Sequence, residues 1–479
     1  MRTEAHGTLG VASLVFALGC ASHSSREDVS AIRAVLATRS ELELVDRDPQ
    51  SWDRTPEDVE SILAEPLDVD AAVRIALLGN RSLRESLAEL GVARGDLVQA
   101  GLLPNPVIDG EIRFPEDQAE PPQYDVGIEI DLTALVLAPI RRDLASARME
   151  VARLRVAGAM LDLAYRVRIA FFRYQASAQQ LELVRTAMDA FAASVAAAEA
   201  LRDAGNYRDL DVAIEEAAYE EARMDVARAE LEALDARERL NVLLGLYGTD
   251  VTWEASARLD DPGDVPLELD DLERRAIEAS LELAEARAEL DAVGRSVGLA
   301  RAEGLVPDIT VGFHAELDGD RWEYGPEMSI ALPVLSQGQG RVLARESELE
   351  GMRERYVGTA IAVRASVRAA RNRAVTTELL ARRYRDVLIP ARARVFEQTL
   401  RQYNAMQVDV FRLLQTRRDQ IAAAIDYVDM LRQHWEARAT LDQLLAGRLA
   451  GTIGRDDMEL GRVGPSRAPG TLRRAEETH

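Results

Sequence analysis

The sequence has no lysine and one cysteine, Cys20, among its 479 residues. A single cysteine excludes an intrachain disulfide. Positive charge is also scarce: 58 basic residues stand against 82 acidic ones, and the formal net charge is −24. Because a nucleic-acid-binding protein needs a basic surface, this balance argues against nucleic acid as a partner.

Long hydrophobic runs and catalytic motifs are missing as well. After Cys20, no apolar run approaches the roughly 18 residues expected of a transmembrane helix, so any membrane crossing has to use strands. The five histidines show no spacing typical of a metal site, and there is no glycine-rich phosphate loop. We therefore predict a protein that is not an enzyme and needs no cofactor.

The N-terminus is typical of an exported protein. A mostly apolar run at 8–19, too short to span a bilayer, ends in Ala17-Leu18-Gly19-Cys20. This ending resembles the lipobox of bacterial lipoproteins, in which the peptide is cleaved before a cysteine that carries a diacylglycerol. The resemblance implies a signal peptide at 1–19 and lipidation of Cys20. The alternative is an ordinary secretory signal that happens to contain a cysteine.

Four short segments alternate apolar and polar residues as membrane-spanning β-strands do. They lie at about 107–115, 124–133, 308–317 and 324–333. Successive side chains point to opposite faces of a strand, so each segment has one apolar and one polar face. We predict that the polar faces line a water-filled lumen whose acidic residues are Asp109, Glu111, Asp125, Glu129, Asp131, Glu316, Asp318 and Glu327.

These lumenal acids are accompanied by one arginine, Arg113, and by one histidine, His314, which we expect to be a pore-lining residue rather than a metal ligand. An interior of this charge favours cations and cationic drugs. The alternative is that barrel interiors are polar in general and that this chain is acidic throughout.

Most of the remaining chain has helical periodicity and forms two copies of one unit. Each copy reads helix, strand, strand, long helix, return helix. We assign a tether to 20–66, a first repeat to 67–250, a second repeat to 267–446 and a disordered tail to 447–479. The first helices are predicted at 68–103 and 272–303, and the long helix of the first repeat between Pro139 and Gly205. Pro390 has no counterpart in the first repeat and should interrupt its helix.

Four strands per chain are too few to close a barrel, and an open sheet edge is not stable in lipid. Two copies would give a narrow barrel filled by its own side chains, whereas three give twelve strands and room for a pore. The expected fold is therefore mainly α with a small β part. A homotrimer would close a twelve-stranded transmembrane β-barrel, with four strands from each chain and the long helices projecting from it.

The motifs that flank these elements resemble those of the TolC-type outer-membrane efflux proteins, in the lipid-anchored branch. In the first repeat they are Leu-Leu-Pro-Asn-Pro at 102–106, Asp-Ala-Gly-Asn at 203–206 and Asn-Val-Leu-Leu-Gly at 241–245. The second repeat adds Leu-Pro-Val-Leu at 332–335 and the turn at 404–409. The resemblance covers about 68–445 and rests on the order of the motifs.

The resemblance implies a passive trimeric exit duct, anchored in the bacterial outer membrane and extending into the periplasm as a long α-helical barrel. It would serve a tripartite efflux pump, joined to a periplasmic membrane-fusion adaptor and an inner-membrane transporter. The helix-tip turns would form the periplasmic gate, with candidate residues Asp203, Gly205, Asp209, Asp211, Asn404 and Asp409. The alternative for Asp209, Asp211 and Asp409 is that they simply complement the dipole at the start of the return helix.

Several alternatives remain open. Drug efflux, heavy-metal cation efflux and type I protein secretion all fit such a duct, although the lipid anchor leans away from protein secretion by family analogy. A rival of another class is a periplasmic coiled-coil lipoprotein whose alternating segments form soluble hairpins. That rival predicts polar residues on both strand faces, or a helix that covers the sheet.

Overall fold

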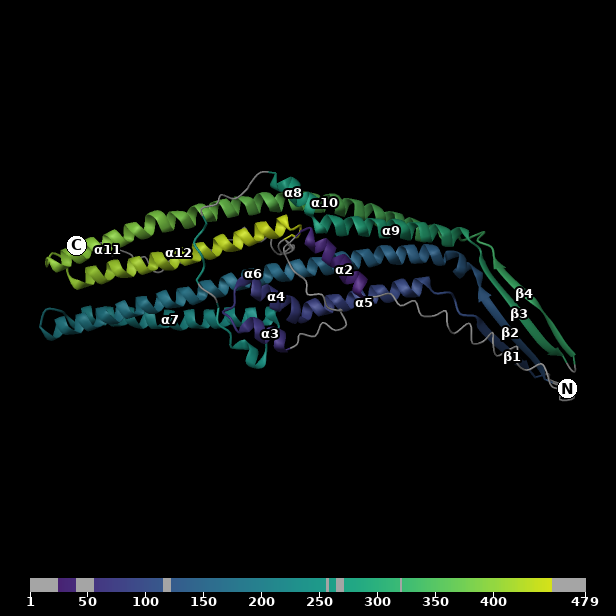
Figure 1. Cartoon of the computed structure of the whole chain (residues 1–479), viewed down its shortest axis with the longest axis horizontal. Coiled ribbons are helices and arrows are strands. Elements are labelled where there is room, and N and C mark those ends of the chain that lie inside the picture. The colour runs from purple at the N-terminus through teal and green to yellow at the C-terminus, as the bar shows by residue number, and fades with distance from the viewer. Residues whose placement is uncertain are drawn as a thin grey trace, which may run out of the picture.

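The molecule is elongated, with a small sheet at one end and two helical hairpin turns at the other (Figure 1). The computed structural model of the chain describes residues 25–39, 56–114, 122–255, 258–263, 271–318 and 321–449. The predicted signal peptide, Cys20 and all but the first three residues of the predicted tail lie outside these ranges. Among the described residues, no helix is both long enough and apolar enough to cross a membrane.

Helices make up most of the chain. Two short ones come first, α2 (Ser25–Ala37) and α3 (Pro56–Leu63). The first half continues with α4 (Val69–Gly79), α5 (Arg81–Gly101), α6 (Leu132–Asp203) and α7 (Asp209–Leu244). The second half contains α8 (Leu272–Ala279), α9 (Leu281–Leu305), α10 (Gln339–Arg383), α11 (Ile389–Asn404) and α12 (Val410–Leu445). The expected mainly α fold is confirmed.

The four strands form one antiparallel sheet in the order β1-β2-β3-β4. Their bounds are β1 Val107–Arg113, β2 Gln123–Asp131, β3 Asp308–Asp318 and β4 Arg321–Ala331. Each strand begins and ends within three residues of the range that alternation predicts. The central pair joins the two halves of the chain, because β2 pairs with β3 and Gly127 lies opposite His314.

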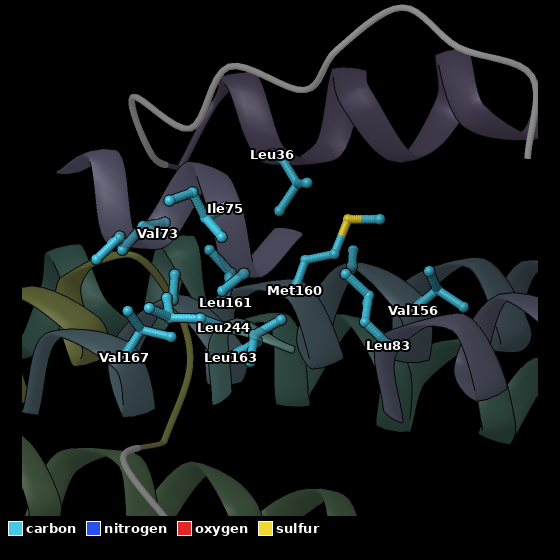
Figure 2. Close-up of a cluster of buried hydrophobic side chains, with 14 of the residues drawn as sticks. Leu36, Val73, Ile75, Leu83, Val156, Met160, Leu161, Leu163, Val167 and Leu244 are labelled. Carbon is cyan, nitrogen blue, oxygen red and sulfur yellow. The ribbon is translucent and has the colours of Figure 1, made fainter. Parts of the chain in front are cut away.

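The main hydrophobic core lies in the middle of the molecule, where short helices pack on α6. Figure 2 shows Leu36 of α2 and Ile75 of α4 lying close to Met160 and Leu161 of α6. All four side chains are at most 2% exposed. Since full burial of such a side chain stabilises a protein by about 1.5–3 kcal/mol, this cluster fastens the short helices to the long one.

A buried ionic cluster also fixes α2. The Asp28 carboxylate accepts hydrogen bonds from Arg94 Nε (2.8 Å) on α5 and Arg153 Nη2 (2.7 Å) on α6. Just beyond the other end of α2, Arg39 Nε donates to the carbonyl of Ala279 in the second half (3.0 Å). The helix that precedes the first half therefore bridges both halves.

The helices predicted at 68–103 and 272–303 are each broken in two, which corrects that expectation. The breaks fall at Asn80 and Ser280, 200 positions apart. Asn80 Oδ1 accepts the Leu83 N–H (3.0 Å) and caps α5, and Ser280 Oγ accepts the Leu283 N–H (3.2 Å) and caps α9. Asn80 Nδ2 also donates to the carbonyl of Leu243 (2.8 Å), so the break is held by a distant helix.

A glycine follows the return helix in each half and packs against the break. Gly245 and Gly447 have φ angles of +69° and +90°. A β-carbon at Gly245 would overlap the backbone of Gly79, and one at Gly447 would overlap that of Ala279. We call each of these contacts, between the glycine and the broken helix, a mid-helix joint.

Two prolines differ in their effect on the long helices. α6 begins at Leu132 rather than at Pro139, because Asp131 accepts the Ala134 N–H (2.9 Å) and caps the helix earlier. Pro139 lies inside α6 and removes one backbone hydrogen bond there. In the second half a π-helical segment, η3 (Tyr384–Leu388), precedes Pro390, where an interruption is predicted.

Candidate functional site

The apolar face of the sheet is open to solvent in the single chain. The sheet projects beyond the helices, and no described helix lies over it (Figure 1). Ile108 and Tyr324 are each 74% exposed, and Met328 is 64% exposed. Tyr124, Trp322 and Tyr324 gather towards the hairpin ends of the strands, as in the aromatic girdle of a membrane barrel. A covering helix, which the soluble-hairpin alternative requires, is absent from the described residues.

The outer strands of the sheet are β1 and β4, and each leaves one edge without a partner strand among the described residues. A free edge presents a row of unpaired N–H and C=O groups, which templates pairing with another chain. The exposed apolar face and the free edges together describe a sheet that is incomplete in one chain.

The opposite face of the sheet is polar and strongly acidic. The strand register aligns its residues in rows that cross all four strands. One row consists entirely of acids: Glu111, Asp125, Glu316 and Glu323. Arg113 lies beside this row and pairs with Glu111 (3.0 Å) and Glu316 (3.8 Å).

A second row contains Asp109, Gly127, His314 and Gly325. The imidazole of His314 contacts carboxylates from the three other strands. Its Nδ1 lies 3.2 Å from Asp125 Oδ1 and 3.9 Å from Asp109 Oδ2, and its Nε2 lies 2.7 Å from Glu327 Oε2. Among the described residues, no group of three or more His, Cys, Asp or Glu side chains has an arrangement that could hold a metal ion.

The register places all eight predicted lumen acids on the polar face: Asp109, Glu111, Asp125, Glu129, Asp131, Glu316, Asp318 and Glu327. Two of them lie at strand ends, where Asp131 also caps α6 and Asp318 lies opposite Arg321. Glu323 was not predicted, because β4 was expected to begin at Tyr324; the alternation of Arg321-Trp322-Glu323 was the available signal.

The first helix-tip turn joins α6 to α7. Gly205 adopts a φ of +77°, and its N–H donates to the carbonyl of Arg202 (2.8 Å). Arg202 pairs with its neighbour Asp203 (2.9 Å), while Asp209 is exposed at the start of α7. These predicted tip residues therefore make contacts within their own turn.

Asp211 lies in the first turn of α7 and is held by Arg208. Its carboxylate accepts from Arg208 Nε (2.8 Å), Arg208 Nη2 (2.9 Å) and the Arg208 backbone N–H (3.3 Å). The hydrogen bond from the Arg208 guanidinium lowers the pKa of Asp211.

The second turn joins α11 to α12 and differs in chemistry. Asn404 is the last residue of α11, and the left-handed residue of this turn is Met406, with a φ of +56°. Asp409 caps α12 by accepting the Arg412 N–H (2.7 Å). Arg401, near the end of α11, pairs with Glu397 (2.6 Å).

The two tips meet through aromatic rather than acidic side chains. Tyr207 of the first turn stacks on Phe411 of α12, with ring centroids 4.9 Å apart and an interplanar angle of 10°. Sequence reasoning missed this contact, because the two residues lie about 200 positions apart and neither belongs to a recognised motif. Partial burial raises the pKa of the Tyr207 hydroxyl.

Further along the helices, Arg418 joins α12 to the first hairpin. Its guanidinium lies 4.3 Å from the ring centroid of Phe191 and 3.7 Å from the carboxylate of Glu215. Ser194 Oγ donates to the same carboxylate (2.6 Å). Burial lowers the pKa of Arg418, so the cation is held in a partly desolvated position between the two hairpins.

Known structures share this architecture. A membrane protein from Pseudomonas aeruginosa matches with a TM-score of 0.67 and 20% identity, covering 79% of this chain and 92% of that one. The CmeC outer membrane channel of Campylobacter jejuni matches with a TM-score of 0.68 and 12% identity, covering 88% of this chain and 97% of the other. The chain therefore shares the fold of these two proteins.

Sequence comparison finds relatives of the same kind. Residues 72–246 match the family model of the outer membrane efflux protein. The cobalt-zinc-cadmium resistance protein CzcC of Cupriavidus metallidurans is 24% identical over 384 residues, which cover 80% of this chain and 90% of that relative. The resemblance drawn from the motifs is confirmed: the chain is similar to outer membrane efflux proteins.

Proposed function

We propose that three copies of this chain form the passive exit duct of a tripartite efflux pump. The observation that carries the proposal is the incomplete sheet, with an exposed apolar face, an acidic face and two free edges. In lipid, an unpaired backbone edge costs several kcal/mol for each unsatisfied group, so the edges have to meet other strands. Three protomers supply twelve strands, which suffice for a barrel with an open interior.

The helices suit the periplasmic part of such a duct. α6 has 72 residues and therefore extends for about 110 Å, several times the thickness of a bilayer. We place the sheet in the outer membrane and the tips at 203–209 and 404–410 towards the inner membrane. There they would meet a membrane-fusion adaptor and an inner-membrane transporter. Lipidation of Cys20 would anchor the chain beside its barrel.

The polar face supports a preference for cationic cargo. Its fully acidic row, repeated in three protomers, would give a ring of twelve carboxylates around the lumen. Such a ring attracts cations and repels anions. We infer a conduit without catalytic chemistry, in which the energy for transport comes from the partner pump.

Heavy-metal cations are a second candidate cargo. The relative CzcC is named for resistance to cobalt, zinc and cadmium, and the acidic rows suit the passage of divalent ions. Since no described cluster has the geometry to hold a metal ion, the proposal is transit through a negative field rather than tight binding.

The test is planar-bilayer conductance of the purified full-length protein, with oligomeric mass and the cation-to-anion permeability ratio measured on the same preparation. We expect a trimer with cation-selective channels. A monomer that extracts without detergent and gives no channels would contradict the proposal.

Adjacent residues on opposite faces of β4 provide a matched pair of variants. Met328→Arg places a charge on the apolar face, where it costs about 2–4 kcal/mol at the bilayer midplane, and should prevent insertion. Glu327→Gln changes the polar face, so it should insert normally and lower the permeability ratio. Equal insertion of both variants would show that the apolar face does not contact lipid.

A further inference from the structure

On the polar face, the side chain of His314 contacts residues from all three other strands of the sheet. His314 lies opposite Gly127 on β2 and opposite Gly325 on β4, so it has no side chain beside it in either direction along its row. A β-carbon at Gly127 would approach to within 2.6 Å of Asp109 Oδ1 and would also overlap the His314 ring. The glycine therefore leaves the space in which His314 meets the carboxylates.

Each of the three other strands contributes a carboxylate that contacts the imidazole of His314. Asp109 comes from β1, Asp125 from β2 and Glu327 from β4, all within 3.9 Å of an imidazole nitrogen. On its own strand, Glu316 lies in the next row and pairs with Arg113 (3.8 Å). His314 thus joins four strands through its side chain, in addition to their backbone hydrogen bonds.

Both nitrogens of the imidazole face carboxylates. A neutral imidazole has one N–H donor, so it can satisfy either the Nδ1 side or the Nε2 side, but not both. The imidazolium has two donors and satisfies both sides at once. The observed geometry is therefore complementary to the protonated ring, and loss of the proton leaves one nitrogen lone pair directed at a carboxylate.

Protonation also changes the charge of the face. Imidazole is the side chain whose ordinary pKa lies between pH 5 and 8, whereas carboxylates stay ionised through that window at their ordinary pKa of about 4. At low pH His314 adds one positive charge per protomer among three carboxylates. At high pH that charge is lost, the field of the face becomes more negative and the carboxylates are freed from the ring.

We propose that His314 is a specificity-determining residue of the channel, which lowers its preference for cations when protonated and raises it when neutral. This inference rests on the proposed duct, in which the polar face lines the lumen. No metal is needed for it: the occupant of the site is a proton, supplied by the solution on either side of the membrane.

The experiment measures reversal potentials of purified wild-type channels in a potassium chloride gradient at pH 5.5 and pH 8.0. We expect the cation-to-anion permeability ratio of the wild type to rise by about twofold between the two values, since one charge per protomer is removed. A ratio that does not change with pH in the wild type overturns the inference without recourse to any variant.

Two substitutions with opposite charge sharpen the test. His314→Gln should give the high ratio at both pH values, and His314→Arg the low ratio at both. Arg113→Gln is the matched control, since it removes a neighbouring positive charge that does not titrate in this range. It should raise the ratio at both pH values and keep the wild-type pH dependence. If His314→Gln retains the full pH dependence, another group is responsible and the inference fails.

Failure of the underlying duct is distinguishable. Absence of any conductance in the wild type would contradict the proposed function, and with it the role of His314. Channels that conduct, and that are cation-selective to the same degree at both pH values, would leave the duct intact and overturn this inference alone.

Discussion

The two halves of the chain agree in the middle of the molecule and differ at the tips. Each half breaks a helix at a polar cap, Asn80 or Ser280, and packs a left-handed glycine, Gly245 or Gly447, against the break. At the tips, by contrast, Gly205 of the first half corresponds to no glycine in the second. The duplicated unit thus repeats its backbone joint and varies the ends that would face partners.

The long helices also differ between the two halves. α6 runs without a break, whereas its counterpart is divided into α10, the π-helical η3 and α11. A π-helical turn loosens the regular hydrogen-bond ladder, and such segments are often found at functional positions. The comparison therefore indicates one continuous helix and one jointed helix in each protomer. Four predictions test how far the halves differ, from the largest expected effect to the smallest.

Gly245→Ala should be the most damaging change, because it combines a left-handed φ of +69° with a collision against the Gly79 backbone. We expect a loss of about 3 kcal/mol in the free energy of unfolding. Gly205→Ala is the matched control: its φ is +77°, but nothing lies within 4 Å of an added β-carbon, so about 1–2 kcal/mol should be lost. Thermal unfolding of the purified protein measures both. Equal losses would show that the mid-helix joint has no packing role.

His434 should make stability depend on pH. The residue is 5% exposed on α12, its Nδ1 has no hydrogen-bond partner, and burial lowers the pKa of its imidazole. Because the unfolded chain binds a proton below about pH 6.5 more readily than the folded chain, stability is lost as the pH falls below that value. The slope is at most about 1.4 kcal/mol per pH unit for each protomer.

The corresponding position of the first half suggests the variant. Leu234, 200 positions earlier, does not titrate and is 62% exposed. His434→Leu should therefore reduce the difference between melting temperatures at pH 7.5 and pH 5.5. If the wild type and the variant lose the same amount on acidification, His434 is not the group responsible.

Asp409→Ala removes the cap of α12 and should cost about 1 kcal/mol in the stability of its first turn. Asp211→Ala should cost less, since the Arg208–Asp211 pair is at the surface, with Arg208 78% exposed. Amide hydrogen exchange in the first turns of α12 and α7 distinguishes the two. A larger increase in exchange for Asp211→Ala than for Asp409→Ala would show that the first tip, rather than the second, is stabilised mainly by its acidic residue.

Met406→Gly should stabilise the second tip slightly. A non-glycine residue at a φ of +56° is strained, and Met406 is 95% exposed, so its side chain contributes little packing. The relief is partly offset by the greater freedom of glycine in the unfolded chain, and we expect a net gain of about 0.5 kcal/mol. Slower hydrogen exchange in the turn would be the sign of this gain. Faster exchange would show that the Met406 side chain holds the turn.

Much of the fold follows from local pattern. Alternation located the strands because each has one apolar face, and Gly205 marked the end of α6. The breaks at Asn80 and Ser280 were missed because nothing local demands them. Asn80 is held by the carbonyl of Leu243, which lies 163 positions away in sequence. The start of α6 was missed because the cap at Asp131 outweighs the signal of Pro139.

The residues of the candidate site also fall into those that local pattern predicts and those that depend on contacts between distant segments. The alternation of each strand predicted which residues share the polar face, because that is a local property. The row that places His314 between Gly127 and Gly325 depends on the register of strands from both halves, which no single segment specifies. The stacking of Tyr207 on Phe411 likewise depends on how the two hairpins pack.

The free edges of β1 and β4 have a kinetic consequence. In the proposed ring, each edge is satisfied only when another protomer arrives, so closure needs two successive encounters. The yield of closed rings then depends steeply on how many protomers share one area of membrane. Dilution in the bilayer, without any change of sequence, would hold the chain in its open, unpaired form.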